Sequence, residues 1–279
     1  MLTALMPLKN YHAGFLAEAV GSLFAQDDPA WRLLVVAERG DLPEFQRVLA
    51  RELEDARVLL IANEGRGLAG ALNTGMRRAT TDFVAILLAD DMWSHDAVAV
   101  LAGYIGRHPE ADFFHSARRI VDESGRARSS VHASRAGVTS ADFVWTSPVT
   151  HLLCWRRELA LAIGGVDESL PPVGPDDYDF PWCMVEAGAV LCAVSECLYL
   201  YRDHREAFRL TTHLPLDVHK AGIRRILEKH GVDPAVIAQR LDAAERSYLR
   251  QCLFHSREDK AAKERAGHDA RTGWRDTYR

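Results

Sequence analysis

Two adjacent acidic residues, Asp90 and Asp91, follow the apolar run FVAILL at residues 83–88. If that run is a strand of a parallel sheet, the pair lies at the carboxyl edge, where ligands of open α/β folds bind. Carboxylate oxygens suit a hard cation such as Mg²⁺ or Mn²⁺, which commonly bridges protein carboxylates to substrate phosphates. The pair therefore predicts a metal and nucleotide site. Its structural alternative is an N-cap for a helix that begins near Ser94.

A second pattern, GRGLAG at residues 65–70, matches the G-x-G-x-x-G fingerprint of dinucleotide-binding proteins. The apolar run VLLIA at 58–62 precedes it, a helical pattern follows it, and Asp90 stands twenty residues after its last glycine. In a dinucleotide-binding fold, however, the glycines directly follow the first strand, whereas here they lie in the third βα unit, after residues 63–64. An NAD-dependent oxidoreductase is therefore the weaker interpretation.

These motifs must be positioned by a regular alternation of apolar runs and amphipathic stretches. We expect strands at 2–6, 33–36, 58–62 and 83–88, and helices at 15–25, 42–53 and 68–79. Strands separated by helices predict an α/β fold with a parallel, doubly wound sheet. Further along we expect a helix at 95–107, a strand near 112–116, a polar mobile connection at 122–140, a helix at 155–163, a Pro- and Gly-rich loop at 170–177, a helix at 178–187 and a strand near 190–194.

The last quarter of the chain has a different pattern. Beyond Arg205, stretches such as RRILEKHG and VIAQRLDAAERSYLRQCL repeat apolar residues at helical spacing. From Arg257 the sequence is charged and poorly patterned. We therefore expect a catalytic and nucleotide-binding domain over residues 1–205 and a helical extension over 206–279 with a loosely ordered tail.

Composition limits the class of protein. The chain has 279 residues, of which 48% are hydrophobic, and a formal net charge of -5, which predicts a packed protein without a nucleic-acid partner. Its five cysteines include no C-x-x-C pair and lie among apolar residues, which indicates reduced, buried thiols. Because we find neither a leader pattern nor a stretch of about 18 apolar residues, we expect no transmembrane segment and a cytoplasmic protein, free or peripheral to a membrane.

The order of the motifs resembles the family-2 inverting glycosyltransferases of the GT-A fold over roughly residues 2–205. In its first part, MPLKN (6–10) stands at the family's opening strand and nucleotide loop, and LLVVAERGD (33–41) at its nucleotide-binding turn. NEGRGLAGALNTGMRRATTDFVAILLADD (63–91) is similar to the helix that leads into the metal-binding D-x-D. In this setting the glycines allow a tight turn and close packing of the helix against the sheet.

The downstream half resembles the same family. WRRELALAIGGVDESL (155–170) followed by GPDDYDF (174–180) is similar to its acceptor-side segment with an E-D pair, and YLYRDH (199–204) to the strand and Arg-x-His that close many of these sites. The resemblance implies a nucleotide-diphosphate sugar donor, an acceptor hydroxyl on a carbohydrate or another molecule, and Mn²⁺ or Mg²⁺ as cofactor. It also implies that the helices beyond residue 205 pack beside an acceptor cleft, which residues 122–150 help to form.

Site residues follow from the resemblance. Asp177 falls on the general base, the carboxylate that takes the proton of the acceptor hydroxyl as it attacks the anomeric carbon, and Asp176 would bind the acceptor or orient the base. The metal ligands would be Asp91, Asp90 and His204. The donor-binding residues would be Pro7, Lys9, Asn10, Glu38, Arg66, Gly67, Asn73 and Asp90.

Structural roles for the same residues stay open. Asp176 or Asp177 could cap a helix that begins at Tyr178, and His204 could be a hydrogen-bonded surface residue. His151 lies near the acceptor segment, where core packing is the simpler explanation.

Two positions depart from the family pattern. Where the nucleotide-binding turn carries two acidic or amide residues, this chain has Ala37 and Glu38, and Leu88 replaces the first acid of D-x-D. Glu38 is one methylene longer than Asp and could still reach a ribose or a base, and a terminal acid pair is compatible with a single metal. Besides an active transferase and the oxidoreductase, a degenerate protein that binds a nucleotide sugar without chemistry remains an alternative.

Overall fold

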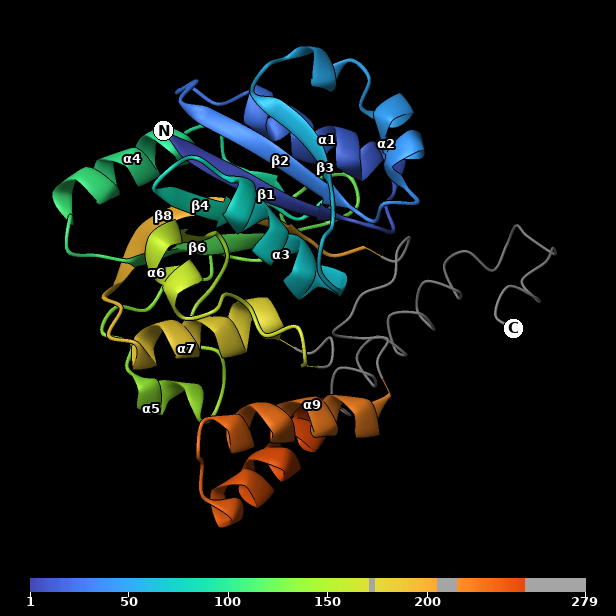
Figure 1. Cartoon of the computed structure of the whole chain (residues 1–279). Coiled ribbons are helices and arrows are strands. Elements are labelled where there is room, and N and C mark those ends of the chain that lie inside the picture. The colour runs from blue at the N-terminus through green and yellow to red at the C-terminus, as the bar shows by residue number, and fades with distance from the viewer. Residues whose placement is uncertain (171–173, 205–214, 249–279) are drawn as a thin grey trace, which may run out of the picture. The chain divides into compact units, whose positions relative to one another are not determined.

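The computed structural model describes residues 1–170, 174–204 and 215–248. The chain divides near residue 208 into two units (Figure 1). The first unit is built on one eight-stranded sheet with helices on both faces. The second unit contains α9 (Leu216–Lys229) and a further helical stretch at 234–248.

The sheet has the order β3-β2-β1-β4-β7-β6-β8-β5. Its strands are β1 (Leu2–Leu8), β2 (Trp31–Ala37), β3 (Val58–Ala62), β4 (Phe83–Ile86), β5 (Met92–Trp93), β6 (Phe113–Val121), β7 (Leu153–Arg156) and β8 (Leu191–Arg202). Strands β1 to β4 are mutually parallel where they pair, β6 pairs in parallel with β8, and β7 and β5 are antiparallel to their neighbours. The carboxyl ends of β1, β2, β4, β6 and β8 therefore meet at one edge, and the predicted mostly parallel sheet is confirmed.

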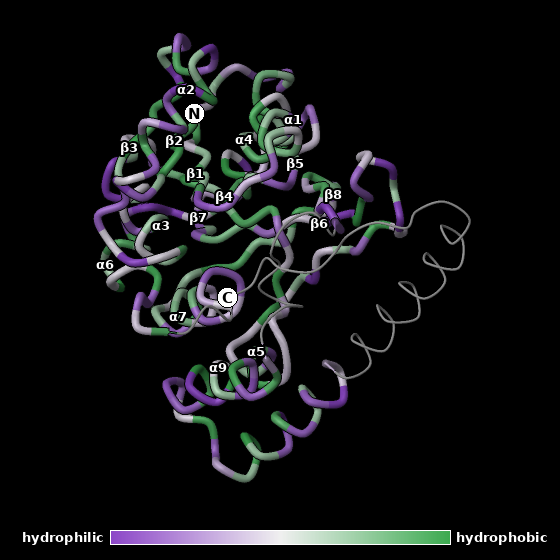
Figure 2. The backbone as a smooth tube through the Cα atoms, turned by 90° about the vertical axis from the view of Figure 1, so that its right-hand side faces the viewer, coloured by the Kyte–Doolittle hydropathy of each residue, from purple (hydrophilic) through white to green (hydrophobic). Residues whose placement is uncertain are grey.

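Helices cover the two faces of this sheet. They are α1 (Ala13–Phe24), α2 (Leu42–Val48), α3 (Gly67–Arg78), α4 (Ala97–Arg107), α5 (Ser140–Phe143), α6 (Arg157–Ala162) and α7 (Phe180–Glu186), with a 3₁₀ turn at Glu52–Glu54 and a π-helical turn at Pro175–Asp179. Figure 2 shows hydrophobic colour along much of the strands and hydrophilic colour on many connecting segments. This distribution is that of a sheet buried between two helical layers.

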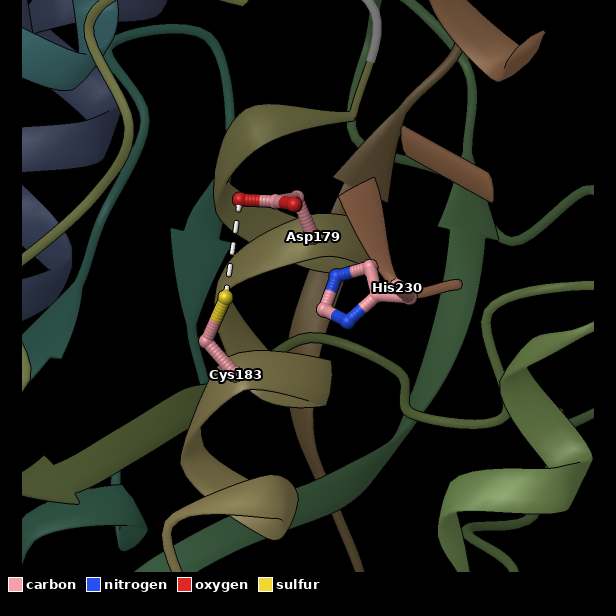
Figure 3. A group of neighbouring side chains, drawn as sticks. All are labelled: Asp179, Cys183 and His230. Carbon is pink, nitrogen blue, oxygen red and sulfur yellow. Dashed lines mark hydrogen bonds between the residues drawn. The ribbon is translucent and has the colours of Figure 1, made fainter. Parts of the chain in front are cut away.

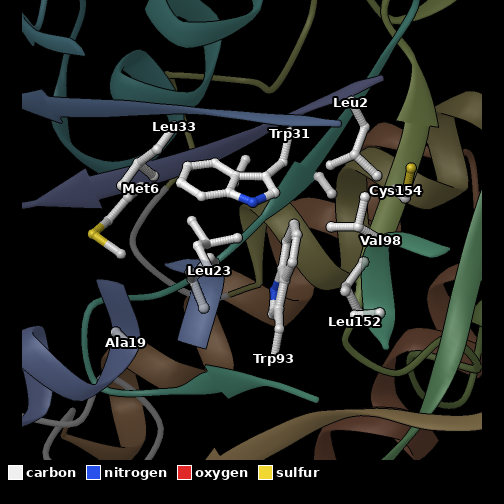
Figure 4. Packing of buried hydrophobic residues seen from close by; sticks show 14 of the residues in the cluster. Leu2, Met6, Ala19, Leu23, Trp31, Leu33, Trp93, Val98, Leu152 and Cys154 are labelled. Atoms are coloured by element: carbon white, nitrogen blue, oxygen red, sulfur yellow. The ribbon is translucent and has the colours of Figure 1, made fainter. Parts of the chain in front are cut away.

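The main core lies on the face covered by α1 and α4. Leu23 of α1 and Val98 of α4 pack there against Trp31 and Trp93, all within 2% exposure (Figure 4). On the other face, a Cβ at Gly75 of α3 would come within 2.8 Å of the Leu5 side chain of β1. A larger residue at this position would force the Leu5 side chain to move, so Gly75 allows the close approach of α3 to β1.

Three expectations about elements need correction. The helix expected at 155–163 begins only at Arg157, because the preceding residues form β7, which pairs antiparallel with both β4 and β6 in the middle of the sheet. The loop expected at 170–177 is partly helical, since Gly174 (φ 61°) starts the π-helical turn that runs into α7. The short strands expected near 112–116 and 190–194 extend to Val121 and Arg202 because they pair with each other.

Other expectations concern the second unit, membranes and thiols. The helical pattern beyond Arg205 is confirmed for residues 216–229 and 234–248, whereas the tail from Arg257 lies outside the described residues. No helix in the described parts of the chain is long and apolar enough to cross a membrane. The four cysteines that the structure describes are free thiols, of which Cys154 is fully buried. Packing of the second unit beside an acceptor cleft stays a prediction.

Candidate active site

Asp90 and His204 meet at the carboxyl edge of the sheet. Asp90 follows β4 and His204 follows β8, two strands that run in the same direction and end at this edge. The Oδ2 atom of Asp90 lies 3.0 Å from Nε2 of His204. The His204 side chain is buried, whereas the Asp90 side chain remains 41% exposed. One carboxylate oxygen and one imidazole nitrogen are thus held together at a surface that solvent reaches, and their predicted role as metal ligands stays a prediction.

Asp91 points the other way, into the protein. Its Oδ2 accepts a 2.7 Å hydrogen bond from the Tyr199 hydroxyl, and its Oδ1 accepts one of 2.7 Å from the backbone N–H of Arg202. Burial, followed by the nearby charge of Asp90, raises the pKa of Asp91 to about 7. Both oxygens are therefore used to fasten β8 next to the Asp90 loop, and the predicted metal-ligand role of Asp91 stays untested.

Arg202 completes this fastening from the end of β8. Its side chain is fully buried and donates to the backbone oxygens of Asp90 at 2.8 Å and of Glu123 at 2.7 Å. It also pairs with the carboxylate of Glu18 and lies over the ring of Phe15, 4.5 Å from the centroid. A buried guanidinium with these partners fixes the backbone of the acidic loop at the site.

The Asp176 and Asp177 pair lies in the π-helical turn before α7. Ser147 donates a 2.5 Å hydrogen bond to the backbone oxygen of Asp177, and Tyr178 donates one of 2.7 Å to the backbone oxygen of Phe143. These bonds hold the turn to the chain that precedes β7. Burial and the charge of Asp176 raise the pKa of Asp177 to about 6 against opposing positive charges. A carboxylate with a pKa near neutrality suits a general base.

His151 connects this pair to the acidic loop. Its buried Nε2 lies 3.8 Å from Oδ2 of Asp176, longer than a hydrogen bond, and has no hydrogen-bond partner among the described residues. Burial lowers the pKa of His151, but the charges of Asp176 and Asp177 outweigh burial, so the net shift is upward. The ring also contacts the Tyr199 ring, tilted by 35° with the two centroids 5.3 Å apart. Tyr199 thus touches both the histidine beside the Asp176 pair and, through its hydroxyl, Asp91.

Asp179 is engaged within its own helix. The thiol of Cys183, one turn later, donates a long 3.9 Å hydrogen bond to Oδ2 of Asp179 (Figure 3). Asp179 is fully buried. This acid is therefore a weaker candidate for the base than Asp177.

The glycine motif does not form a dinucleotide site. The backbone N–H of Arg66, at the start of α3, donates a 2.8 Å hydrogen bond to the Glu168 carboxylate, and a Cβ on Gly65 would come within 2.6 Å of that carboxylate. In a dinucleotide fold this helix terminus binds the pyrophosphate. Because a protein carboxylate already occupies it, the oxidoreductase interpretation loses its binding site.

Asn73 and Arg66 are joined to the same segment. The Asn73 amide donates to the backbone oxygen of Val166 at 2.8 Å and to Glu168 at 2.9 Å, and its oxygen accepts from the Val166 N–H at 2.8 Å. The Arg66 guanidinium donates to the Glu168 backbone oxygen at 2.6 Å. Gly67 takes the positive φ of 61° that opens α3. Donor contacts by these three residues stay predictions, and their observed bonds position the segment that leads to Asp176.

The remaining predicted donor residues lie on the same sheet edge as Asp90. Pro7 is the penultimate residue of β1, and Lys9 and Asn10 are exposed just beyond the end of the strand. Glu38 follows β2, and its Oε1 accepts a 3.1 Å hydrogen bond from the Asn63 amide. The structure therefore gathers these side chains around the edge that carries the acidic loop, while their contacts to a donor stay predictions.

Two residues of the site escape sequence reasoning. Glu168 occupies the α3 terminus, and Tyr199 links Asp91 to His151. A glutamate after a glycine pair and a tyrosine in a strand carry no distinctive pattern. Their partners lie far away in sequence, so only the fold reveals them.

Comparison with known proteins identifies glycosyltransferases as relatives of this chain. The profile of the family described as Glycosyl transferase family 2 matches residues 3–159, more than half of the chain. The O-antigen biosynthesis protein RfbC of Myxococcus xanthus is 28% identical over 235 residues, which cover 82% of this chain and 18% of that protein. The UDP-Glc:alpha-D-GlcNAc-diphosphoundecaprenol beta-1,3-glucosyltransferase WfgD of Escherichia coli is 33% identical over 95 residues, 33% of this chain and 36% of that protein. The chain thus spans about a fifth to a third of the length of these relatives.

Solved structures share the fold. TarS of S. aureus in complex with UDP-GlcNAc matches with a TM-score of 0.60 at 17% identity, over 86% of this chain and 70% of that chain. The mannosyltransferase PcManGT from Pyrobaculum calidifontis, in complex with GDP-Man and Mn²⁺, matches with a TM-score of 0.57 at 21% identity, over 97% and 76%. The predicted GT-A fold is confirmed, and the chain belongs to glycosyl transferase family 2.

Proposed function

We propose that this protein is a metal-dependent inverting glycosyltransferase that moves a sugar from a nucleoside diphosphate donor to an acceptor hydroxyl. The observation that carries the proposal is the pairing of Asp90 with His204 at 3.0 Å, on the edge to which Tyr199 and His151 connect the Asp176 pair. The names of relatives support a sugar nucleotide as donor, because WfgD is a UDP-Glc transferase and TarS and PcManGT bind UDP-GlcNAc and GDP-Man.

The donor set fits a divalent cation. An exposed carboxylate oxygen beside an imidazole nitrogen suits Mn²⁺ or Mg²⁺ with further ligands from the substrate and water. Such an ion would neutralise charge on the leaving diphosphate. The Asp90 carboxylate and the His204 imidazole would hold it, and Arg202 would keep the Asp90 backbone in place through its 2.8 Å hydrogen bond.

The chemistry proposed for the chain's own residues is a single displacement. Asp177 takes the proton of the acceptor hydroxyl while the hydroxyl oxygen attacks the anomeric carbon from the side opposite the diphosphate. The bond between that carbon and the diphosphate oxygen breaks, and the nucleoside diphosphate leaves with the electron pair. The raised pKa of Asp177, about 6, leaves the carboxylate ionised at neutral pH yet basic enough to share the proton.

Calorimetry of UDP and GDP binding, in Mn²⁺ and in EDTA, tests the donor site. We expect binding only with the metal, and we expect Asp90→Asn to weaken it by at least about tenfold because the variant loses a charged metal ligand. Asp82→Asn is the matched control, since this exposed acid stands at the opposite end of β4. Equal affinity in EDTA and in Mn²⁺, with Asp90→Asn unchanged, would remove the metal site.

The variant Asp91→Asn distinguishes the role of Asp91 from that of Asp90. Because Asp91 accepts two hydrogen bonds inside the protein, we expect this variant to lower stability more than it weakens metal-dependent binding. If instead it abolishes Mn²⁺-dependent binding in a protein that unfolds at the wild-type temperature, Asp91 is a metal ligand, as the sequence predicts.

A further inference from the structure

Arg118 presents a positive charge on the active-site face of the sheet. It lies in β6, directly opposite Tyr199 of β8, and residues paired in this way point to the same face. Its guanidinium carbon lies 5.1 Å from the centroid of the Tyr201 ring, which fixes the plane of the group. Its Nε is buried and has no hydrogen-bond acceptor among the residues that the structure describes.

Two arginines later in the chain, Arg128 and Arg135, have acidic partners, unlike Arg118. Arg128 pairs with Asp203 at 3.1 Å, and Arg135 pairs with Asp142 at 2.5 Å. A guanidinium donates in five directions and is costly to bury without acceptors. Within the described part of the chain, Arg118 is thus a partly buried cation without an ion pair, although its charge reaches the Asp177 carboxyl.

The location of Arg118 indicates which substrate supplies that partner. Its charge acts on the Asp177 carboxyl and on His151. The diphosphate of the donor, by contrast, is expected at Asp90 and His204. A group bound by Arg118 therefore sits where the acceptor hydroxyl must approach Asp177.

We propose that Arg118 binds an oxyanion of the acceptor, a phosphate or carboxylate group close to the hydroxyl that receives the sugar. This inference rests on the proposed function and narrows the acceptor to an anionic carbohydrate or another anionic hydroxyl compound. The planar fork of arginine matches either oxyanion through two parallel hydrogen bonds. The ring of Tyr201 holds this fork before the substrate arrives, so little side-chain freedom is lost on binding.

The test uses methyl phosphate and acetate as probes, titrated by calorimetry into the full chain already saturated with a nucleoside diphosphate and Mg²⁺. We expect the wild type to bind at least one probe at millimolar concentration, and Arg118→Met to lose at least about tenfold in affinity. The probe that binds more tightly distinguishes phosphate from carboxylate.

Arg119→Met is the matched control. Arg119 follows Arg118 in β6 and also has a buried Nε without an acceptor, but it points to the opposite face, where its charge acts on the Cys197 thiol. This variant should bind the probes as the wild type does. Arg118→Lys, which keeps the charge and loses the fork, should retain part of the affinity and shows that the folded site survives substitution.

Three results would overturn the proposal: a wild type that binds neither probe, Arg118→Met and wild type with equal affinity, or a probe that binds only when the nucleoside diphosphate is left out. The last result would assign the oxyanion to the donor. Failure of the proposed function would give a different result, because then no nucleoside diphosphate binds to the protein. In that case the affinities of Arg118→Met and Arg119→Met for the probes can still be compared without the nucleotide.

Discussion

The two halves of the first unit differ in how they satisfy buried polar side chains. In the donor half, β1 to β4 with α1 and α3, such groups bond to one another: the hydroxyls of Thr3 and Thr81 lie 2.7 Å apart, and the Asn73 amide makes three hydrogen bonds. In the acceptor half, β6, β7 and the segment between them, four buried nitrogens have no hydrogen-bond partner among the described residues. These are His115 Nδ1, Arg118 Nε, Arg119 Nε and His151 Nε2.

No such atom occurs in the described residues before His115. Native proteins leave few buried polar groups unpaired, and those that remain call for a functional or structural reason. The difference indicates that folding alone completes the donor half. The other half keeps unused hydrogen-bonding capacity at Arg118 and His151, near Asp177, so we expect substitutions at these residues to alter turnover and substitutions at contacts such as the one between Asn73 and Glu168 to alter stability.

Asp177→Asn should produce the largest effect. It preserves the shape of the turn but removes the proton acceptor, and general-base catalysis is typically worth about 10² to 10⁴ in rate. We expect at least a roughly hundredfold loss of transfer with unchanged donor affinity. The readout is single-turnover transfer, or donor hydrolysis while the acceptor is unidentified. Asp176→Asn should lose less, and near wild-type transfer by Asp177→Asn would shift the base to Asp176 or Asp179.

Glu168→Ala should come next and should act on stability. The Arg66 N–H and the Asn73 amide would lose their acceptor, so we expect the free energy of unfolding to fall by about 1–3 kcal/mol in urea titrations. Glu158→Ala is the control, because this glutamate is exposed on the neighbouring helix α6. If both variants unfold at the same urea concentration, the donor half does not depend on this contact.

The effect of pH on the rate of transfer should be intermediate in size between the effects of these variants and that of the next one. Burial and Asp176 raise the pKa of Asp177 to about 6, so protonation below that pH removes the base, and transfer should fall about tenfold per unit below it. The same raised pKa means that ionising Asp177 costs folding stability as pH rises through 6, and Asp177→Asn should remove this component. His151→Gln should move the midpoint of the rate profile upward, because the charge of His151 lowers the pKa of Asp177.

Rates measured at saturating donor and metal provide the check on that profile. A rate constant that is flat between pH 5 and pH 8 would show that Asp177 does not titrate in the reaction.

Glu38→Ala should give the smallest change. Glu38 stands at the nucleotide-binding turn beside Ala37 and is held by Asn63 at 3.1 Å. Losing a single contact to a ribose or base in a partly exposed position should weaken nucleotide binding by less than about tenfold. Calorimetry with UDP and GDP, against Glu52→Ala as control, measures the change. A loss far beyond tenfold would make Glu38 the main determinant of the donor base.

The sequence predicts local features well and distant contacts poorly. Hydrophobic periodicity predicts β1 to β4, α1 and α3, because their buried faces follow the local period of a strand or a helix, whereas the helix expected at 42–53 ends at Val48. It was misleading at Leu153–Arg156, where an apolar run before a helical pattern forms a strand only because β4 and β6 offer their edges. Tertiary pairing of this kind is not encoded in a local window.

In the candidate site, too, the sequence indicates some residues, whereas the contacts between distant residues appear only in the structure. The family resemblance brought Asp90, His204 and Asp177 to attention, and the fold brings the first two into contact. Glu168 reaches a partner 102 residues away, at Arg66, and the position of Arg118 opposite Tyr199 appears only in the fold. Pairings across such distances depend on strand order, which no local sequence pattern specifies.

The antiparallel pairing of β6 with β7 has a practical consequence for the exchange of parts between family members. His115 pairs with Leu153, and the Ser116 N–H bonds to the Leu152 oxygen at 3.0 Å, so the two chain ends that bound residues 122–150 leave from adjacent strands. An exposed excursion with anchored ends tolerates changes in length and composition at little entropic expense. The mostly exposed residues 123–137 can therefore be exchanged or lengthened, while residues 140–150 stay with the host, because Phe143 and Ser147 hold the Asp177 turn.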